Sequence, residues 1–230
     1  MTASVPLSIV MPVLDEAGRI GQSISALSPL LARGVELIVV DGGSSDDTVV
    51  VARERGARVI SAARSRAAQM NAGAAAARGQ ALLFLHADTE LPADADRQVI
   101  AALERRPWGR FDVMIDGRHW MLPVIAVLMS VRSRLTGIAT GDQAMFMRRE
   151  IFERVGGFPP QLLMEDIELS ARLRQLSRPA RVRARATTSG RRWDTHGTWR
   201  TILLMWRLRM AYWWGTPAAE LHRRYYPPSR

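Results

Sequence analysis

The chain has 230 residues, 47% of them hydrophobic, which is enough for one α/β domain with a sizeable core and too little for two. It contains no cysteine, which excludes disulfides, thiolate metal sites and a cysteine nucleophile. The formal charge of +10 comes from arginine alone, and it suits nucleic acid, anionic lipid or an anionic substrate without choosing among them.

The first half of the chain predicts alternating strands and helices. Apolar runs bounded by polar breaks predict strands at residues 7–13, 36–40, 58–61 and 81–85. Because each strand is followed by a helical segment, the strands are expected to run parallel, with right-handed crossovers. Beyond Pro92 this alternation weakens.

The connecting helices are predicted from spacing and caps. Ile20, Ile24, Leu27 and Leu31 follow helical spacing and predict one helix after the first strand. Alanine-rich residues 65–78 predict another before the fourth strand. Between the second and third strands, Ser44 with Asp47 resembles a capping box that starts a helix.

Three of the predicted strands end in acidic residues: Asp15 and Glu16 after the first, Asp41 after the second and Asp88 after the fourth. Carboxyl ends of parallel strands share one edge of the sheet, so these acids are expected to surround one ligand. Taken singly, each acid could instead start a helix or shape a turn. Their clustering is what indicates a binding site.

The chemistry of these side chains suits a nucleoside diphosphate. A carboxylate accepts hydrogen bonds from a ribose hydroxyl or a base imide, and a divalent cation binds a carboxylate and a diphosphate together. Asp88 is therefore a candidate metal ligand. Arg66 could reach a base or phosphate from the same edge, although an ordinary solvated arginine explains it equally well.

A second candidate site follows Met164. Leu169, Leu173 and Leu176 form an apolar helical stripe, and Asp166, three positions before Leu169, is predicted on the same inward face. A helix N-terminus stabilises a charged carboxylate, which suits a base that takes a proton from a hydroxyl. An ordinary N-cap aspartate is the alternative.

Together these segments resemble the family 2 glycosyltransferases of the nucleotide-binding A-type fold, and in particular a small bacterial subgroup of arsenosugar-type glycosyltransferases. The matching segments are 8–16 (SIVMPVLDE), 39–48 (VVDGGSSDDT), 84–89 (FLHADT), 141–149 (GDQAMFMRR), 156–158 (GGF) and 165–166 (ED). Their agreement in order argues against a chance match. The resemblance implies a three-layer α/β/α fold with a mainly parallel sheet and a C-terminal helical extension.

The resemblance also implies an inverting transfer from a nucleotide-diphosphate sugar, assisted by Mg²⁺ or Mn²⁺, to a small-molecule or lipid-linked acceptor. Residues 141–146 would shape the acceptor pocket. By the same resemblance, the nucleoside site would be lined by Pro12, Glu16 and Asp41. Arg66 would face the base or the diphosphate, Asp88 would coordinate the metal, and Asp166 would be the general base.

Two departures from the family pattern matter. His86 stands where the family has its first metal-motif aspartate, so either its imidazole assists the ion or Asp88 binds it alone with diphosphate and water; we favour the second. The Gln-x-x-Arg-Trp motif of processive polymerases appears only partly, at residues 189–193 (SGRRW), which argues against polymer synthesis. His196 could reach the diphosphate or the metal, or simply lie in a loop.

The C-terminal part carries a tryptophan-rich stripe. Trp199, Leu203, Trp206, Met210 and Trp213 recur at helical spacing. We expect this stripe to be buried in the core or in a homodimer, with a membrane surface as the alternative that the nearby arginines favour. We divide the chain into a catalytic domain, residues 1–195, and an amphipathic extension of it, residues 196–230.

The remaining expectations concern location and competing functions. Residues 1–6 lack the features of an export signal, and the apolar run 122–131 is too short to span a membrane, so we expect a cytoplasmic protein or one at the cytoplasmic face of the membrane. A nucleotidyltransferase usually has a glycine-rich, basic phosphate-binding loop near its N-terminus. Residues 11–15 (MPVLD) do not supply one, which argues against that activity. A non-catalytic basic module for nucleic acid or membrane fits the aligned acids poorly, and we expect no nucleic-acid partner.

Overall fold

The computed structural model describes residues 5–225, except for the side chain of His196. The expectation about an export signal therefore falls largely outside the described residues, as does the end of the proposed C-terminal extension. The strands are β1 (Leu7–Val13), β2 (Glu36–Asp41), β3 (Arg58–Ser61), β4 (Ala81–Phe84), β5 (Thr89–Glu90), β6 (Trp108–Asp116), β7 (Phe146–Arg148) and β8 (Ala180–Ser189). The four strands predicted in the first half of the chain are thus present, within one residue of their expected ends.

The helices connect and follow these strands. They are α1 (Ala17–Ala26), α2 (Ser28–Leu31), α3 (Thr48–Glu54), α4 (Arg66–Ala76), α5 (Ala95–Arg105), α6 (Leu122–Thr136), the 3₁₀ turn η1 (Gly141–Gln143), α7 (Arg149–Arg154), α8 (Glu165–Leu176), α9 (Arg191–His196), α10 (Thr198–Trp213) and α11 (Ala218–Tyr225). The proposed boundary at residues 195/196 falls inside α9.

Within residues 5–225 the strands form one eight-stranded sheet in the order β3-β2-β1-β4-β7-β6-β8-β5. Strands β1 to β4 pair in parallel, as do β6 and β8. Strand β7 is antiparallel to both of its neighbours, and β5 is antiparallel to β8. The mainly parallel α/β fold is confirmed, with antiparallel strands in the half where the alternation weakens.

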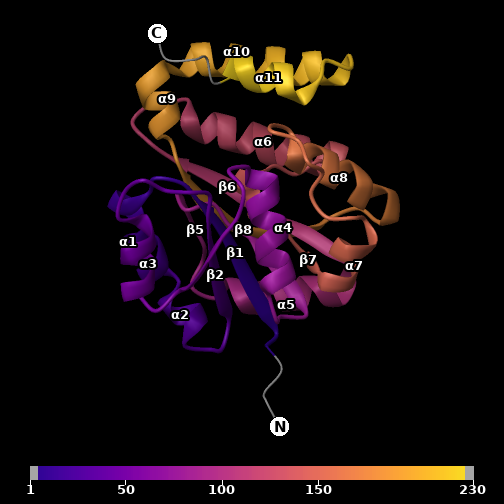
Figure 1. Ribbon diagram of the computed structural model, residues 1–230. Helices are drawn as coiled ribbons and strands as arrows, with labels where there is room; N and C mark the ends of the chain where they lie inside the picture. Colours follow the sequence, from indigo (N-terminus) through magenta and orange to yellow (C-terminus); the bar gives the residue numbers. More distant parts are fainter. Residues whose placement is uncertain (1–4, 226–230) are drawn as a thin grey trace.

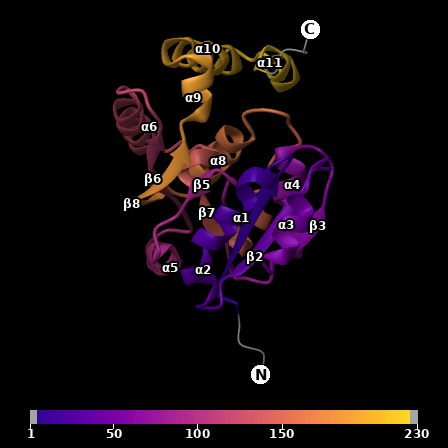
Figure 2. The same ribbon diagram turned by 90° about the vertical axis from the view of Figure 1, so that its left-hand side faces the viewer.

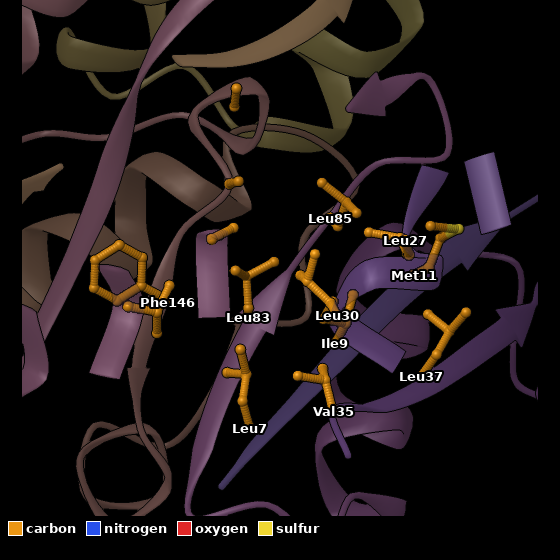
Figure 3. Packing of buried hydrophobic residues seen from close by; sticks show 14 of the residues in the cluster. Leu7, Ile9, Met11, Leu27, Leu30, Val35, Leu37, Leu83, Leu85 and Phe146 are labelled. Carbon is orange, nitrogen blue, oxygen red and sulfur yellow. The ribbon is translucent and has the colours of Figure 1, made fainter. Parts of the chain in front are cut away.

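Helices cover both faces of the sheet and make three layers (Figure 1). Alternate residues of β1 point to opposite faces: Ile9 belongs to a core that includes residues of α1, α2 and α5, whereas Val10 belongs to one that includes residues of α4, α7 and α8. Figure 3 shows the first of these two cores, where side chains of β1, β2 and β4 meet those before and within α2. Gly73 of α4 lies so close to Val10 that a Cβ there would be 2.3 Å from it.

Two local predictions were wrong. The predicted first helix is split into α1 and α2, because Pro29 has no N–H for an uninterrupted helix and instead occupies the first turn of α2. The Ser44–Asp47 capping box is absent from the described structure: α3 begins at Thr48, and the Ser44 hydroxyl donates to Asp41 instead. The first N–H of α3, that of Thr48, instead donates to the carboxylate of Asp46, at 3.0 Å.

The C-terminal helices lie across the carboxyl end of the parallel strands. Figures 1 and 2 place α10 and α11 at the end of the sheet opposite the N-terminus, with α6 next to α10. Leu208 and Leu221 pack with Met164 near the start of α8, and Ile202 packs against the α6 core. Helix α10 therefore rests on both α6 and the α8 region.

The tryptophan-rich stripe is not buried in the core of the chain. Its members remain exposed, from 48% for Met210 to 90% for Trp213. The expectation of burial in the domain core is therefore wrong, because α10 contacts the domain through other residues, among them Ile202 and Leu208. No helix among residues 5–225 is long and apolar enough to cross a bilayer.

Candidate functional site

A cleft of about 860 Å³ lies between the carboxyl ends of the strands and the C-terminal helices. Its volume is in the range of small-molecule and cofactor sites. Of the six site residues predicted from sequence, five line it: Pro12, Glu16, Arg66, Asp88 and Asp166. Asp41 is not among the described residues that line the cleft.

Asp41 instead holds the turn that follows β2. Its carboxylate accepts hydrogen bonds from the Gly43 N–H (3.0 Å), the Ser44 N–H (3.1 Å) and the Ser44 hydroxyl. The same hydroxyl accepts a bond from the Asp15 N–H, at 2.9 Å. The turn after β2 is thereby fastened to the turn after β1, which positions the neighbouring Glu16.

Glu16 and Asp88 bring two carboxylates together at the ends of β1 and β4. Partial burial raises the pKa of Glu16; Asp88 raises it further, while Arg191 and Arg19 lower it. Arg191 lies 175 residues away in the sequence, just beyond β8, and lines the same cleft. The negative charges of the two side chains therefore oppose each other, which favours a cation near them.

His86, two residues before Asp88, turns toward another partner. Its Nδ1 lies 3.6 Å from the Asp142 carboxylate, and its ring packs on Gly141 so tightly that a Cβ there would be 2.4 Å from the ring. Asp142 also lines the cleft, within the segment expected to shape the acceptor pocket.

Asp166 lies in the first turn of α8 and faces the cleft. Its carboxylate accepts hydrogen bonds from the Gly141 N–H and from its neighbour Ile167, both at 2.8 Å. Below it, Leu169 and Leu173 are buried as predicted, but Leu176 at the helix end is 38% exposed. The acid and the Gly141 loop are thereby held in one arrangement, beside Asp142.

Glu165 is the carboxylate that sequence reasoning passed over. Its side chain is buried at the cleft, 3.9 Å from the guanidinium of Arg66. Burial raises the pKa of Glu165, and the charge of Asp166 raises it further, against the opposing effect of Arg66. The helical stripe singled out Asp166, whereas the burial of Glu165 depends on packing across the cleft.

Backbone strain gathers around the cleft. The non-glycine residues with left-handed φ in residues 5–225 are Asp15 (53°), Ala144 (45°) and Met164 (65°). Each lies within two residues of a cleft acid: Glu16, Asp142 and Glu165, respectively. Such conformations cost of order 1–3 kcal/mol and cluster at binding sites.

Arg132 on α6 adds a buried cation that sequence reasoning also missed. Its Nε and one terminal nitrogen have no hydrogen-bond partner among the described residues. Burial lowers the pKa of Arg132, and the charges of Asp166 and Asp142 oppose that shift. The charge of Arg132 therefore offsets part of the negative charge of these two acids.

A divalent cation fits this cleft only with help from a ligand. Residues 5–225 contain no group of three or more His, Asp or Glu side chains placed to hold a metal. Asp88, with Glu16 beside it, offers the hard oxygen donors that Mg²⁺ and Mn²⁺ use together with substrate phosphates. The donor set thus suits an ion that arrives with a diphosphate.

Comparison with known sequences points to one family. The model of glycosyl transferase family 2 matches residues 8–156. Glucosyl-3-phosphoglycerate synthase of Mycolicibacterium paratuberculosis is 52% identical over 56 residues, which cover 24% of this chain and only 17% of that enzyme. An uncharacterized glycosyltransferase of Mycobacterium bovis is 26% identical over 179 residues, 69% of this chain and 77% of the relative.

Solved structures share the fold. The glucosyl-3-phosphoglycerate synthase of Mycobacterium tuberculosis, in complex with Mn²⁺, UDP and glucosyl-3-phosphoglycerate, has a TM-score of 0.61 at 23% identity, covering 81% of this chain and 71% of that one. A Pyrobaculum calidifontis mannosyltransferase with GDP-Man and Mn²⁺ scores 0.65 at 20% identity, covering 91% and 62%. At these identities the likeness concerns the fold, and the arsenosugar-type subgroup stays a prediction. Because the family pattern covers more than half of the chain, from β1 to just past α7, the chain belongs to glycosyl transferase family 2.

Proposed function

We propose that the protein is an inverting glycosyltransferase that moves a sugar from a nucleotide-diphosphate donor to an acceptor hydroxyl, with Mg²⁺ or Mn²⁺. The observation that carries this proposal is the meeting of Glu16, Arg66 and Asp88 with Asp166 in one cleft of a family 2 chain. Family membership favours glycosyl transfer over the nucleotidyl-transfer and binding-module alternatives.

The donor would bind along the ends of β1 and β4. Pro12 and Glu16 would line the nucleoside site, and Asp41 would support them from behind by holding the adjoining turns. Asp88 would hold the metal ion, which supplies positive charge that stabilises the leaving diphosphate. Arg66 would add a fixed cation on the same side. The solved relatives with UDP or GDP-Man and Mn²⁺ support this class of donor.

Asp166 would act as the general base. Its carboxylate would take the proton of the acceptor hydroxyl while that oxygen attacks the anomeric carbon. The bond from this carbon to the diphosphate oxygen breaks on the opposite side, so the sugar changes configuration and the nucleoside diphosphate leaves with the bonding electrons. The Gly141 N–H, 2.8 Å from the carboxylate, fixes its orientation.

The acceptor would enter from the side of the Gly141 loop, close to Asp142 and Asp166. We propose a small-molecule or lipid-linked hydroxyl and a cytoplasmic reaction. Residues 1–195 would form the catalytic domain, and residues 196–230 its helical extension.

The proposal is tested by a thermal-shift screen of UDP, GDP and their sugars, each with and without Mn²⁺. A ligand that binds the folded state raises its unfolding temperature, so one nucleotide series should raise it, and more so with Mn²⁺. That donor is then incubated with candidate acceptors to follow transfer. If no nucleoside diphosphate or its sugar shifts the transition under either condition, the proposal is wrong.

A further inference from the structure

Helix α10 presents an unusually aromatic surface. Trp199, Leu203, Trp206, Met210 and Trp213 are 61%, 63%, 68%, 48% and 90% exposed. At 3.6 residues per turn they form one stripe along the helix. Arg200 and Arg207 follow one edge of this stripe and Arg209 the other. A helix with exposed tryptophans between flanking arginines has the composition of one that lies in a membrane interface.

The neighbouring helix α6 repeats this arrangement. Val124, Val127, Leu128, Val131 and Leu135 are 37% to 72% exposed and also form a single stripe. Trp120, just before the helix, is 73% exposed. Figure 2 shows α6 and α10 next to each other at the carboxyl end of the sheet, and Ile202 of α10 packs against the α6 core. Two adjoining helices thus expose apolar stripes, and large exposed apolar patches mark interaction surfaces.

The charge of this region has a single sign. No acidic residue occurs between Asp116 and Asp142, or between Asp194 and Glu220, so α6 and α10 carry arginine and no carboxylate. A symmetric homodimer through these stripes would bring the arginines of one copy against those of the other. An anionic lipid surface would instead attract each arginine near it and accept the tryptophan rings at headgroup depth.

The opposite sides of the same helices line the cleft. Met129 of α6 and Thr201, Met205 and Leu208 of α10 face it, and Arg209, at one edge of the α10 stripe, also reaches it. Each helix therefore separates the cleft from the exposed stripe by no more than its own thickness. A hydroxyl carried on a lipid headgroup would have a short path from a bilayer under these helices to the cleft.

We propose that the surface formed by the exposed apolar stripes of α6 and α10 docks on an anionic bilayer. It would lie in the bilayer interface without crossing the membrane. The docking itself is independent of the catalytic role. Its consequence, that the acceptor is reached at the bilayer surface, rests on the glycosyl transfer proposed above. Docking on a bilayer would restrict the choice of acceptor class, from a small molecule or a lipid to a lipid-linked hydroxyl.

Flotation of the whole protein with vesicles tests the docking. Vesicles of phosphatidylcholine are compared with vesicles containing about 30% phosphatidylglycerol, at about 0.15 M salt. We expect binding to the anionic vesicles, a blue shift of tryptophan emission and weakening at higher salt. The double variant Trp206→Glu/Trp213→Glu should bind at least about tenfold more weakly.

A matched control adds the same charge elsewhere. Val50 on α3 and Ile100 on α5 are 52% and 36% exposed, and Val50→Glu/Ile100→Glu should bind as the parent protein does. Both double variants should keep the parent unfolding temperature and its shift with nucleotide and Mn²⁺. Those shifts report the donor site, so loss of docking and failure of the catalytic proposal are told apart.

Three results would overturn the docking. One is equal binding to neutral and anionic vesicles, or none to either. Another is unchanged binding of the tryptophan variant. The third is a lipid-free dimer in sedimentation that Trp206→Glu/Trp213→Glu converts to a monomer, which would make a second copy the occupant.

Discussion

The surroundings of the buried carboxylates at the two ends of the parallel strands shift their pKa values in opposite directions. At the amino end, Glu36 accepts hydrogen bonds from the Ser8 hydroxyl (2.6 Å), and from the backbone N–H (2.7 Å) and Nε (2.9 Å) of Arg78. Burial works to raise the pKa of Glu36, but these bonds outweigh it and lower the pKa. At the carboxyl end, burial and Asp166 raise the pKa of Glu165, and Arg66 does not offset them.

This difference distinguishes a carboxylate that stabilises the fold, Glu36, from one placed to bind a ligand, Glu165. A carboxylate whose oxygens already accept hydrogen bonds from the protein contributes to stability and has few acceptor positions free for a ligand. Carboxylates crowded together at the other end cost stability until a cation or a ligand joins them, a pattern typical of binding sites.

The largest effect is expected at Asp166. Asp166→Asn removes the proposed base while keeping its shape, so transfer should fall about a thousandfold with donor binding retained. Glu168→Gln is the control, since Glu168 lies in the same turn of α8 and pairs with Arg172. Rates come from a transfer assay and donor binding from thermal shift. Near-parent turnover of Asp166→Asn would remove it from that role.

Asp88→Asn should lower Mn²⁺-dependent nucleotide affinity and transfer by about a hundredfold, because an amide is a much poorer ligand for a hard cation. Titration calorimetry with and without Mn²⁺ measures this. Asp94→Asn, at an exposed acid beyond β5, should bind as the parent does. An unchanged Mn²⁺ dependence in Asp88→Asn would show that the ion is held elsewhere.

Glu36→Gln should destabilise the fold by about 2 kcal/mol at neutral pH, since partners that met a charged carboxylate then face an amide. Activity per folded molecule should not change. The lowered pKa makes this stability present above the unfolded pKa of about 4.3 and lost as the pH falls through the folded value. Urea unfolding of both proteins between pH 7 and 3 should therefore converge.

Glu165→Gln should have the opposite sign and be smaller. Because the folded pKa of Glu165 is raised, its ionised form costs stability at neutral pH, and the amide should gain about 1 kcal/mol. The gain should disappear as the pH falls below the unfolded pKa, where the parent carboxyl is protonated in both states. A loss of stability at pH 7 would mean that the ion pair with Arg66 outweighs the burial.

The first half of the fold was predictable because short apolar runs and helical spacing indicate its strands and helices locally. The apolar run before His86 and the one before Asp41 predicted β4 and β2, and acids after parallel strands share an edge by geometry. The family motifs narrowed the chemistry. Prediction failed where competing local partners decide, as in the turn where Ser44 bonds Asp41 and not the helix that follows.

Local sequence was enough to predict strands β1 to β4, the sheet edge at which their acids lie, and the stripe on α10, since backbone periodicity and chain direction are local properties. Tertiary structure alone decided the rest: that His86 meets Asp142, that Arg191 comes to Glu16, and that the tryptophans of α10 face outward. These depend on contacts between segments far apart in the chain. Spacing reveals that a stripe exists, whereas only packing determines what covers it.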